Sequence, residues 1–144
     1  MARYSKETTI NAPADKVFNY VSDFPRHSEW AQNNLEVTSS SGGATAVGST
    51  FNTVGHALGA QRESQTVTEY EPGKRFAFES KGALGITRNS FDLAPEGGGT
   101  RLTKSLEFVK PSFLARVVSL KVGHDAPKAL EEDLRRIKQK LETS

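Results

Sequence analysis

The chain has 144 residues, of which 35% are hydrophobic and 25% charged, with a formal net charge of +2 and no cysteine. This length predicts a single domain, residues 1–144, that can bury a core or line a cavity. The scattered placement of 19 basic and 17 acidic residues argues against nucleic-acid binding, and the lack of cysteine excludes disulfides and thiolate-bound metals. Because no segment has the pattern of a membrane span or signal peptide, we expect a cytoplasmic protein without stable membrane insertion.

The N-terminal stretch predicts a strand followed by a short helix. Residues from Tyr4 to Ile10 have a strand-like pattern, and the chain then enters an amphipathic helix that ends at residues 23–25. Pro13 suits the first helical position, where its missing N–H removes no hydrogen bond. The spacing i, i+3, i+4 and i+7 forms one apolar stripe, which consists of Ala14, Val17, Phe18 and Val21.

Six further segments read as strands, several of them with alternating apolar and polar residues. They cover residues 35–38, 48–55, 61–70, 75–80, 86–93 and 100–108. Because most of the connections are short turns, the segments favour an antiparallel meander over parallel crossovers. With the first segment, they predict a sheet of seven strands.

The last third of the chain changes to helical periodicity. Apolar residues recur at three- and four-residue spacing at Leu130, Leu134, Ile137 and Leu141. We expect one helix from near residue 111 to residue 141, bent between Gly123 and Pro127, because a proline inside a helix removes a hydrogen bond. A true break in this region is the alternative.

Several motifs, taken in order, carry a resemblance to a known family. They are residues 9–18 and 21–23 with Trp30, residues 69–78, the pair 91–93 and 99–103, and the helix end at 134–142. In this order the chain resembles the START-like (SRPBCC) superfamily of polyketide cyclases/dehydrases and lipid-transport proteins, which has a Bet v 1-like helix-grip fold. The resemblance implies an α+β domain in which a curved seven-stranded antiparallel sheet is followed by a long C-terminal helix packed across it. Two short helices would follow the first strand.

A helix-grip fold implies a cavity between sheet and helix. The side chains expected to line it are Phe51, Phe76, Phe78, Phe91, Leu102, Leu106, Phe108, Phe113, Val117, Leu120 and His124. The alternative is that the apolar members simply fill the core. A one-residue slip in register would invert any strand.

Few polar residues are candidates for chemistry. His124 continues the apolar stripe of the last helix and could act in the cavity as an acid, a base or a hydrogen-bond donor. Arg88 and Lys104 share the parity of nearby apolar residues, but we expect them at the surface because a buried unpaired cation is costly. We also expect His27 at the surface. The three histidines lack metal-ligand spacing, so neither a metal nor another cofactor is expected.

Two glycine-flanked loops, residues 55–59 and 82–85, are either ordinary connections or lips at a cavity mouth.

Three functions remain open for such a domain. The first is a carrier or sensor that binds a small hydrophobic molecule, such as a lipid, an isoprenoid or a polyketide-like compound. The second is a cyclase/dehydrase-type enzyme, for which His124 and Arg88 are the candidate catalytic residues. The third is a module that docks on a protein or membrane through Lys110, Phe113, Leu114, Arg116 and Lys121. The residues leave the ligand, the presence of catalysis and the oligomeric state undetermined.

Overall fold

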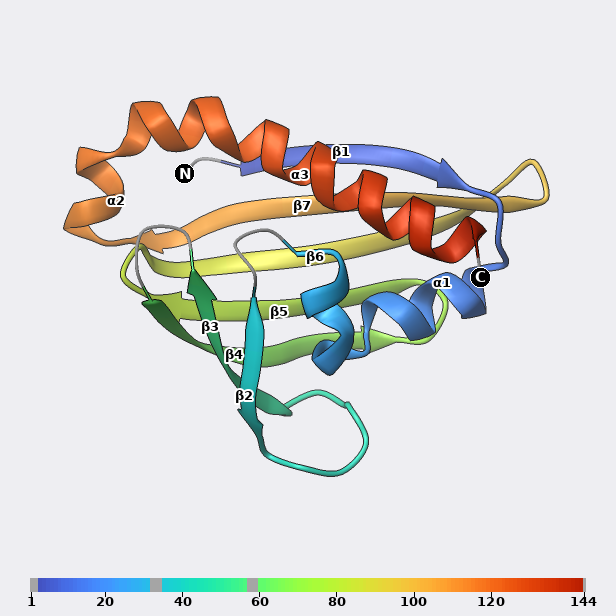
Figure 1. Ribbon diagram of the computed structural model, residues 1–144, viewed down its shortest axis with the longest axis horizontal. Helices are drawn as coiled ribbons and strands as arrows, with labels where there is room; N and C mark the ends of the chain where they lie inside the picture. Colours follow the sequence, from blue (N-terminus) through green and yellow to red (C-terminus); the bar gives the residue numbers. More distant parts are fainter. Residues whose placement is uncertain (1–2, 32–34, 57–59, 144) are drawn as a thin grey trace.

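The computed structural model describes residues 3–31, 35–56 and 60–143. Seven antiparallel strands form one sheet in the order β1-β7-β6-β5-β4-β3-β2, and a long helix lies across one face (Figure 1). The strands are β1 (Arg3–Ile10), β2 (Glu36–Ser40), β3 (Thr50–His56), β4 (Ala60–Glu71), β5 (Arg75–Gly82), β6 (Gly85–Glu96) and β7 (Gly99–Pro111). The helices are α1 (Ala14–Val21), the 3-10 helix η1 (Phe24–Glu29), α2 (Phe113–Val117) and α3 (Ser119–Glu142). The predicted α+β helix-grip fold is confirmed.

The sheet is a meander in which only β1 departs from neighbour pairing. Strands β2 to β7 each pair with the next strand in the sequence, and β1 pairs with β7, with Tyr4 opposite Leu106 and Ile10 opposite Thr100. This pairing places the start of the chain beside the last strand, under α3. Lys6 on β1 forms a 2.9 Å ion pair with Glu131 on α3.

The N-terminal helix begins one residue later than predicted. Pro13 is the N-cap, with an extended backbone (φ −69°, ψ 155°), and α1 ends at Val21. The 3-10 helix η1 follows directly and buries Phe24 and His27. The two short helices expected after the first strand are therefore present.

The C-terminal segment forms two helices, not the single helix that was predicted. The break lies at Val118 (φ −98°, ψ 17°), which ends α2 and precedes α3. Pro127 lies inside α3, so the alternative of a true break between Gly123 and Pro127 is wrong. A proline ring crowds the carbonyl four residues earlier, and that residue here is Gly123, which has no side chain of its own.

The core fills one end of the space between sheet and helix. Its fully buried members include Phe18, Phe76, Phe91, Leu102 and Ile137, which come from α1, three strands and the C-terminal half of α3. Within the described residues, no helix combines the length and apolarity that crossing a bilayer requires. The N-terminal half of α3 covers the remaining space, where the candidate site lies.

Candidate functional site

A cavity of about 280 Å³ lies between the sheet and α3, next to the core. Its walls come from η1, from β4 to β7 and from α3. The lining residues are Phe24, His27, Trp30, Ala31, Leu35, Glu63, Gln65, Phe78, Ser80, Leu84, Gly85, Thr87, Asn89, Lys104, Leu106, Phe108, Ala126, Ala129, Leu130 and Asp133. The hollow along β2 lies on the outer surface, and a smaller hollow lies between β1, β7 and the junction of α2 with α3. The cavity of about 280 Å³ is the candidate site because it lies between the two layers of the fold and combines aromatic with polar side chains.

Seven of the predicted lining residues lie at the cavity or in the adjacent core. Phe78, Leu106 and Phe108 are in the cavity wall. Phe51, Phe76, Phe91 and Leu102 are buried in the core. These last four side chains therefore fill the core, which was the alternative to lining the cavity.

The other four predicted residues, Phe113, Val117, Leu120 and His124, lie outside the cavity. All four are exposed, and the expectation that they line the cavity is wrong. The inward stripe of α3 runs back from Leu141 through Ile137, Leu134 and Leu130 to Ala126, so His124 faces away. His124 instead contacts Asp125 (3.1 Å) and Lys128 (3.4 Å) on the outer surface. The break at Val118 ends the continuity that the prediction assumed.

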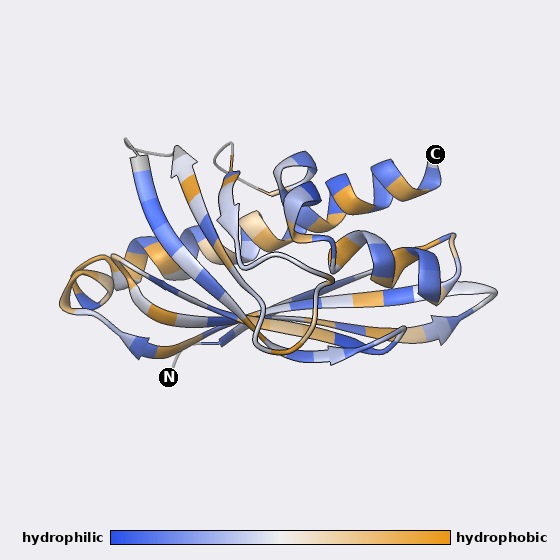
Figure 2. Ribbon diagram, turned by 90° about the horizontal axis from the view of Figure 1, so that it is seen from below, coloured by the Kyte–Doolittle hydropathy of each residue, from blue (hydrophilic) through white to orange (hydrophobic). Residues whose placement is uncertain are grey.

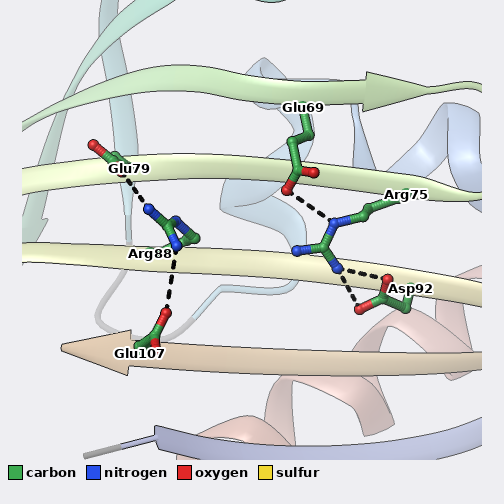
Figure 3. Close-up of polar contacts among 6 residues, drawn as sticks. All are labelled: Glu69, Arg75, Glu79, Arg88, Asp92 and Glu107. Carbon is green, nitrogen blue, oxygen red and sulfur yellow. Dashed lines mark hydrogen bonds and ion pairs between the residues drawn. The ribbon is translucent and has the colours of Figure 1, made fainter. Parts of the chain in front are cut away.

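Arg88 faces away from the cavity, at the surface where it was expected, so it is not placed to act there as a catalytic residue. Asn89 lines the cavity and Phe91 is buried in the core, and Arg88 points to the opposite face of the sheet. There it contacts Glu79 on β5 at 3.0 Å and Glu107 on β7 at 3.5 Å (Figure 3). A register shift between Ile86 and Thr87 separates Ile86 from this alternation, so the parity that Arg88 shares with Ile86 in the sequence does not place it on the cavity side.

A second cross-strand group lies on the same outer face. Arg75 contacts Glu69 at 2.9 Å and Asp92 at 2.6 Å, again joining three neighbouring strands (Figure 3). These partly exposed pairs support the sheet from outside and contribute no polar group to the cavity.

Lys104 is the cation that does enter the cavity wall. Only 5% of its surface is exposed, so the expected surface position is wrong. Its Nζ lies 3.6 Å from Asp133 Oδ2 on α3 and 5.7 Å and 5.5 Å from the ring centres of Trp30 and Phe91. Burial lowers the pKa of Lys104, and the Asp133 carboxylate opposes that shift. Asp133 was not among the predicted site residues, although its position three residues after Leu130 marks it as part of the inward stripe.

His27, expected at the surface, is almost fully buried. Its neutral ring donates from Nε2 to the Val21 carbonyl at 2.8 Å and stacks on Phe24 at 4.1 Å between centroids. Burial lowers the pKa of His27 to about 3, so the ring stays neutral at physiological pH. A neutral ring that already uses one nitrogen explains how a histidine sits in an aromatic core.

A chain of hydrogen bonds forms a second polar region, on β3 to β6. Asn89 Nδ2 donates to Ser80 Oγ at 3.4 Å, and Ser80 donates to the Gln65 side-chain carbonyl. Gln65 Nε2 donates in turn to Thr53 Oγ1 at 3.1 Å. Glu63 lies two residues before Gln65 on β4. Burial raises the pKa of the Glu63 carboxyl, and its hydrogen bond with Gln65 opposes that shift. None of these residues was predicted as part of the site, because isolated polar residues in strands carry no pattern.

The turn between β5 and β6 lies at the rim of the cavity. It is one of the two glycine-flanked loops, and its Leu84 and Gly85 line the cavity. In the other loop, residues 57–59 lie outside the described residues.

The curved sheet with a long helix packed across it is a helix-grip fold, and an aromatic cavity with two polar regions lies between these two layers. The chain belongs to the polyketide cyclase/dehydrase and lipid transport family, whose model matches residues 1–142.

Solved structures share the fold at low sequence identity. The chain is similar to protein CV1439 from Chromobacterium violaceum (14% identity, TM-score 0.76, 99% of each chain covered). It is also similar to TTHA0849 from Thermus thermophilus (19% identity, TM-score 0.76, 97% of each chain). A third similar structure is DynU16, described as a protein in the dynemicin biosynthetic locus (20% identity, TM-score 0.64, 98% of this chain and 47% of that chain). No curated protein matches the chain significantly.

Proposed function

We propose that the protein binds a small, largely apolar molecule in the cavity, as a carrier or sensor. The observation that carries this proposal is the cavity between sheet and helix whose walls include Phe24, Trp30, Phe78 and Phe108. Ligand pockets are typically apolar with a few placed polar groups, and span about 300–1,000 Å³. At about 280 Å³, this cavity fits a compact isoprenoid- or polyketide-like molecule better than a whole long-chain lipid.

The Lys104–Asp133 pair supports a ligand that is neutral but carries an acceptor oxygen. The 3.6 Å separation is longer than a hydrogen bond, and an ammonium has three N–H donors to satisfy. A carbonyl or ether oxygen in the cavity would satisfy one of them. A carboxylate would meet Asp133 as well as Lys104, so the pair disfavours anions.

A second candidate function is acid–base catalysis of the cyclase/dehydrase kind. The observation that favours it is the presence of titratable groups in the cavity wall, with the pKa of Glu63 raised and that of Lys104 lowered by burial. Lys104 would polarise a ligand carbonyl and Asp133 would take a proton from the adjacent carbon. The likeness to DynU16, from a biosynthetic locus, agrees with this candidate.

Binding of 2-acetylnaphthalene, measured by titration calorimetry, tests the first proposal. Ala129→Phe places a large side chain inside the cavity and should abolish binding. Lys128→Phe adds the same side chain at the neighbouring position and serves as the matched control. Equal binding by the wild type and Ala129→Phe, or no binding by the wild type, would contradict the proposal.

Matched ligands test the role of Lys104. The planar hydrocarbon 2-isopropenylnaphthalene has the shape of the ketone without its oxygen, and 2-naphthoate replaces the methyl ketone by a carboxylate. We expect the ketone to bind roughly tenfold or more tightly than either in the wild type, and the advantage over the hydrocarbon to vanish in Lys104→Met/Asp133→Asn.

The catalytic candidate has a separate readout. If Asp133 and Lys104 enolise a bound ketone, the methyl hydrogens of 2-acetylnaphthalene should exchange with D₂O faster with the wild type than with Lys104→Met/Asp133→Asn. Equal exchange rates, followed by mass spectrometry, would leave binding as the function of the cavity.

A further inference from the structure

We propose that α2 and the first turns of α3 form a surface that docks on an anionic phospholipid bilayer. The docking surface consists of Phe113, Leu114, Val117 and Leu120 with the cations Lys110, Arg116 and Lys121. It lies outside the cavity and its docking does not depend on ligand binding.

The apolar part of the docking surface is unusually exposed. Phe113 is 82% exposed and Leu120 92%, and Leu114 and Val117 are exposed as well. Among the described residues, only one other large apolar side chain, Val47, is comparably exposed. Figure 2 shows orange segments in the helical tip at the left, the α2 end of the molecule in Figure 1. Single exposed apolar residues are ordinary, whereas a cluster of four marks an interaction surface.

The charge of this segment selects the partner. Between Glu107 and Asp125 the sequence contains no acidic residue, but it contains Lys110, Arg116 and Lys121. Lys121 forms a 2.8 Å ion pair with Asp125, while Lys110 and Arg116 pair with no carboxylate among the described residues. Apolar side chains flanked by cations are the composition that binds the interface of an anionic membrane.

A second copy of the chain is a poorer partner for the same surface. A two-fold symmetric contact would place each cation of the docking surface near those of the other copy, because both subunits use the same patch. An anionic bilayer instead offers lipid headgroups to the cations and acyl chains to Phe113 and Leu120.

Hydrogen bonds connect the docking surface to the rim of the cavity. Ser112 Oγ caps α2 by accepting from the Ala115 backbone N–H at 3.2 Å, and it donates to the Ala83 carbonyl at 2.7 Å. The Ser112 backbone N–H donates to the Leu84 carbonyl at 3.1 Å. Since Leu84 lines the cavity, docking through α2 would hold the cavity rim near the bilayer. If the proposed ligand is lipophilic, that rim is where it would enter.

Vesicle flotation tests the docking. The full chain is mixed with vesicles of phosphatidylcholine alone or with added phosphatidylserine, and the bound fraction gives a partition coefficient. We expect binding to the anionic vesicles and little to the neutral ones. Phe113→Gln/Leu120→Gln should lower the coefficient at least tenfold, and Arg116→Gln/Lys121→Gln should lower it roughly fivefold for each cation removed.

Matched controls replace the same residue types elsewhere on the surface. Val47→Gln removes an exposed apolar side chain outside the docking surface, and Lys16→Gln/Lys140→Gln removes two exposed cations outside it. Each control should leave the partition coefficient within about twofold of the wild-type value. Circular dichroism melts verify that each variant is folded.

Absence of binding to anionic vesicles, equal binding to both vesicles, or equal losses in controls and test variants would overturn the proposal. So would a dimer in sedimentation equilibrium that Phe113→Gln/Leu120→Gln dissociates. Each of these results leaves the calorimetric test of the cavity unaffected.

Discussion

Lys104 Nζ on β7 lies 3.6 Å from Asp133 Oδ2 on α3, so a buried ion pair joins the sheet to the helix that covers it. Both side chains are almost fully removed from solvent. A pair of this kind is weak evidence for net stability, because desolvation offsets the attraction. It does make each partner depend strongly on the other.

Asp133→Asn should therefore destabilise the protein by about 3–5 kcal/mol, since it leaves a buried cation without its carboxylate. Lys104→Met/Asp133→Leu removes both charges and should lose less than the single substitution. Urea denaturation at neutral pH measures both. If the losses of Lys104→Met and Asp133→Leu, measured singly, added up to the loss of the double variant, the pair would not be coupled.

Acidification should destabilise the protein through His27. The unfolded ring takes a proton below its ordinary pKa of 6.5, whereas the folded ring, with its pKa lowered by burial, stays neutral until about pH 3. The unfolded state then binds more protons than the native state, so the free energy of unfolding falls as the pH drops through this window. One proton corresponds to about 1.4 kcal/mol per pH unit.

His27→Gln keeps a hydrogen-bond donor for the Val21 carbonyl but does not titrate. Although it is less stable than the wild type at neutral pH, its stability should change less between about pH 6 and pH 4. Parallel pH profiles for the two proteins would assign the acid sensitivity to other groups.

Arg88→Ala should be nearly silent. Its partners Glu79 and Glu107 are partly exposed, so the loss is expected to stay below about 1 kcal/mol. Because Arg88 faces away from the cavity, the affinity for 2-acetylnaphthalene should not change. A tenfold loss of affinity, measured by calorimetry, would place Arg88 in the binding site after all.

Gly85→Ala should be far more damaging than Gly98→Ala. Both glycines have positive φ angles, +95° and +85°, which cost a side chain about 1–2 kcal/mol. At Gly85 an added Cβ would also lie 2.2 Å from the Lys110 carbonyl oxygen, whereas Gly98 has open space around it. The melting temperature of Gly98→Ala reports the backbone strain alone, and that of Gly85→Ala reports the strain together with the clash. Equal melting temperatures would contradict the close approach at the cavity rim.

The residues that the sequence placed correctly are those with a regular pattern. The stripe of Val17, Phe18 and Val21 is buried in the core, and six strand segments pair in a meander as predicted. Local signals of this kind depend on a few neighbouring residues, so they survive without knowledge of the rest of the fold.

The placement of charged and polar side chains was harder to predict. Arg88 and Lys104 both alternate in step with nearby apolar residues of their strands. In the structure, however, Arg88 points outward to Glu79 and Glu107, and Lys104 points inward to Asp133. The register shift after Ile86 and the carboxylate on a distant helix decide between them. His124 was misplaced because the inward stripe of α3 begins at Ala126, and residue 124 lies on another side of the helix.

The sequence by itself determined the order of strands and helices, because hydrophobic periodicity and helix-start signals are encoded locally, and its resemblance to a known family implied the helix-grip arrangement. Only the tertiary structure decided which polar groups enter the cavity and which apolar side chains stay exposed on α2. Burial of Lys104 is tolerable only where Asp133 meets it, and those residues lie on different elements that folding brings together.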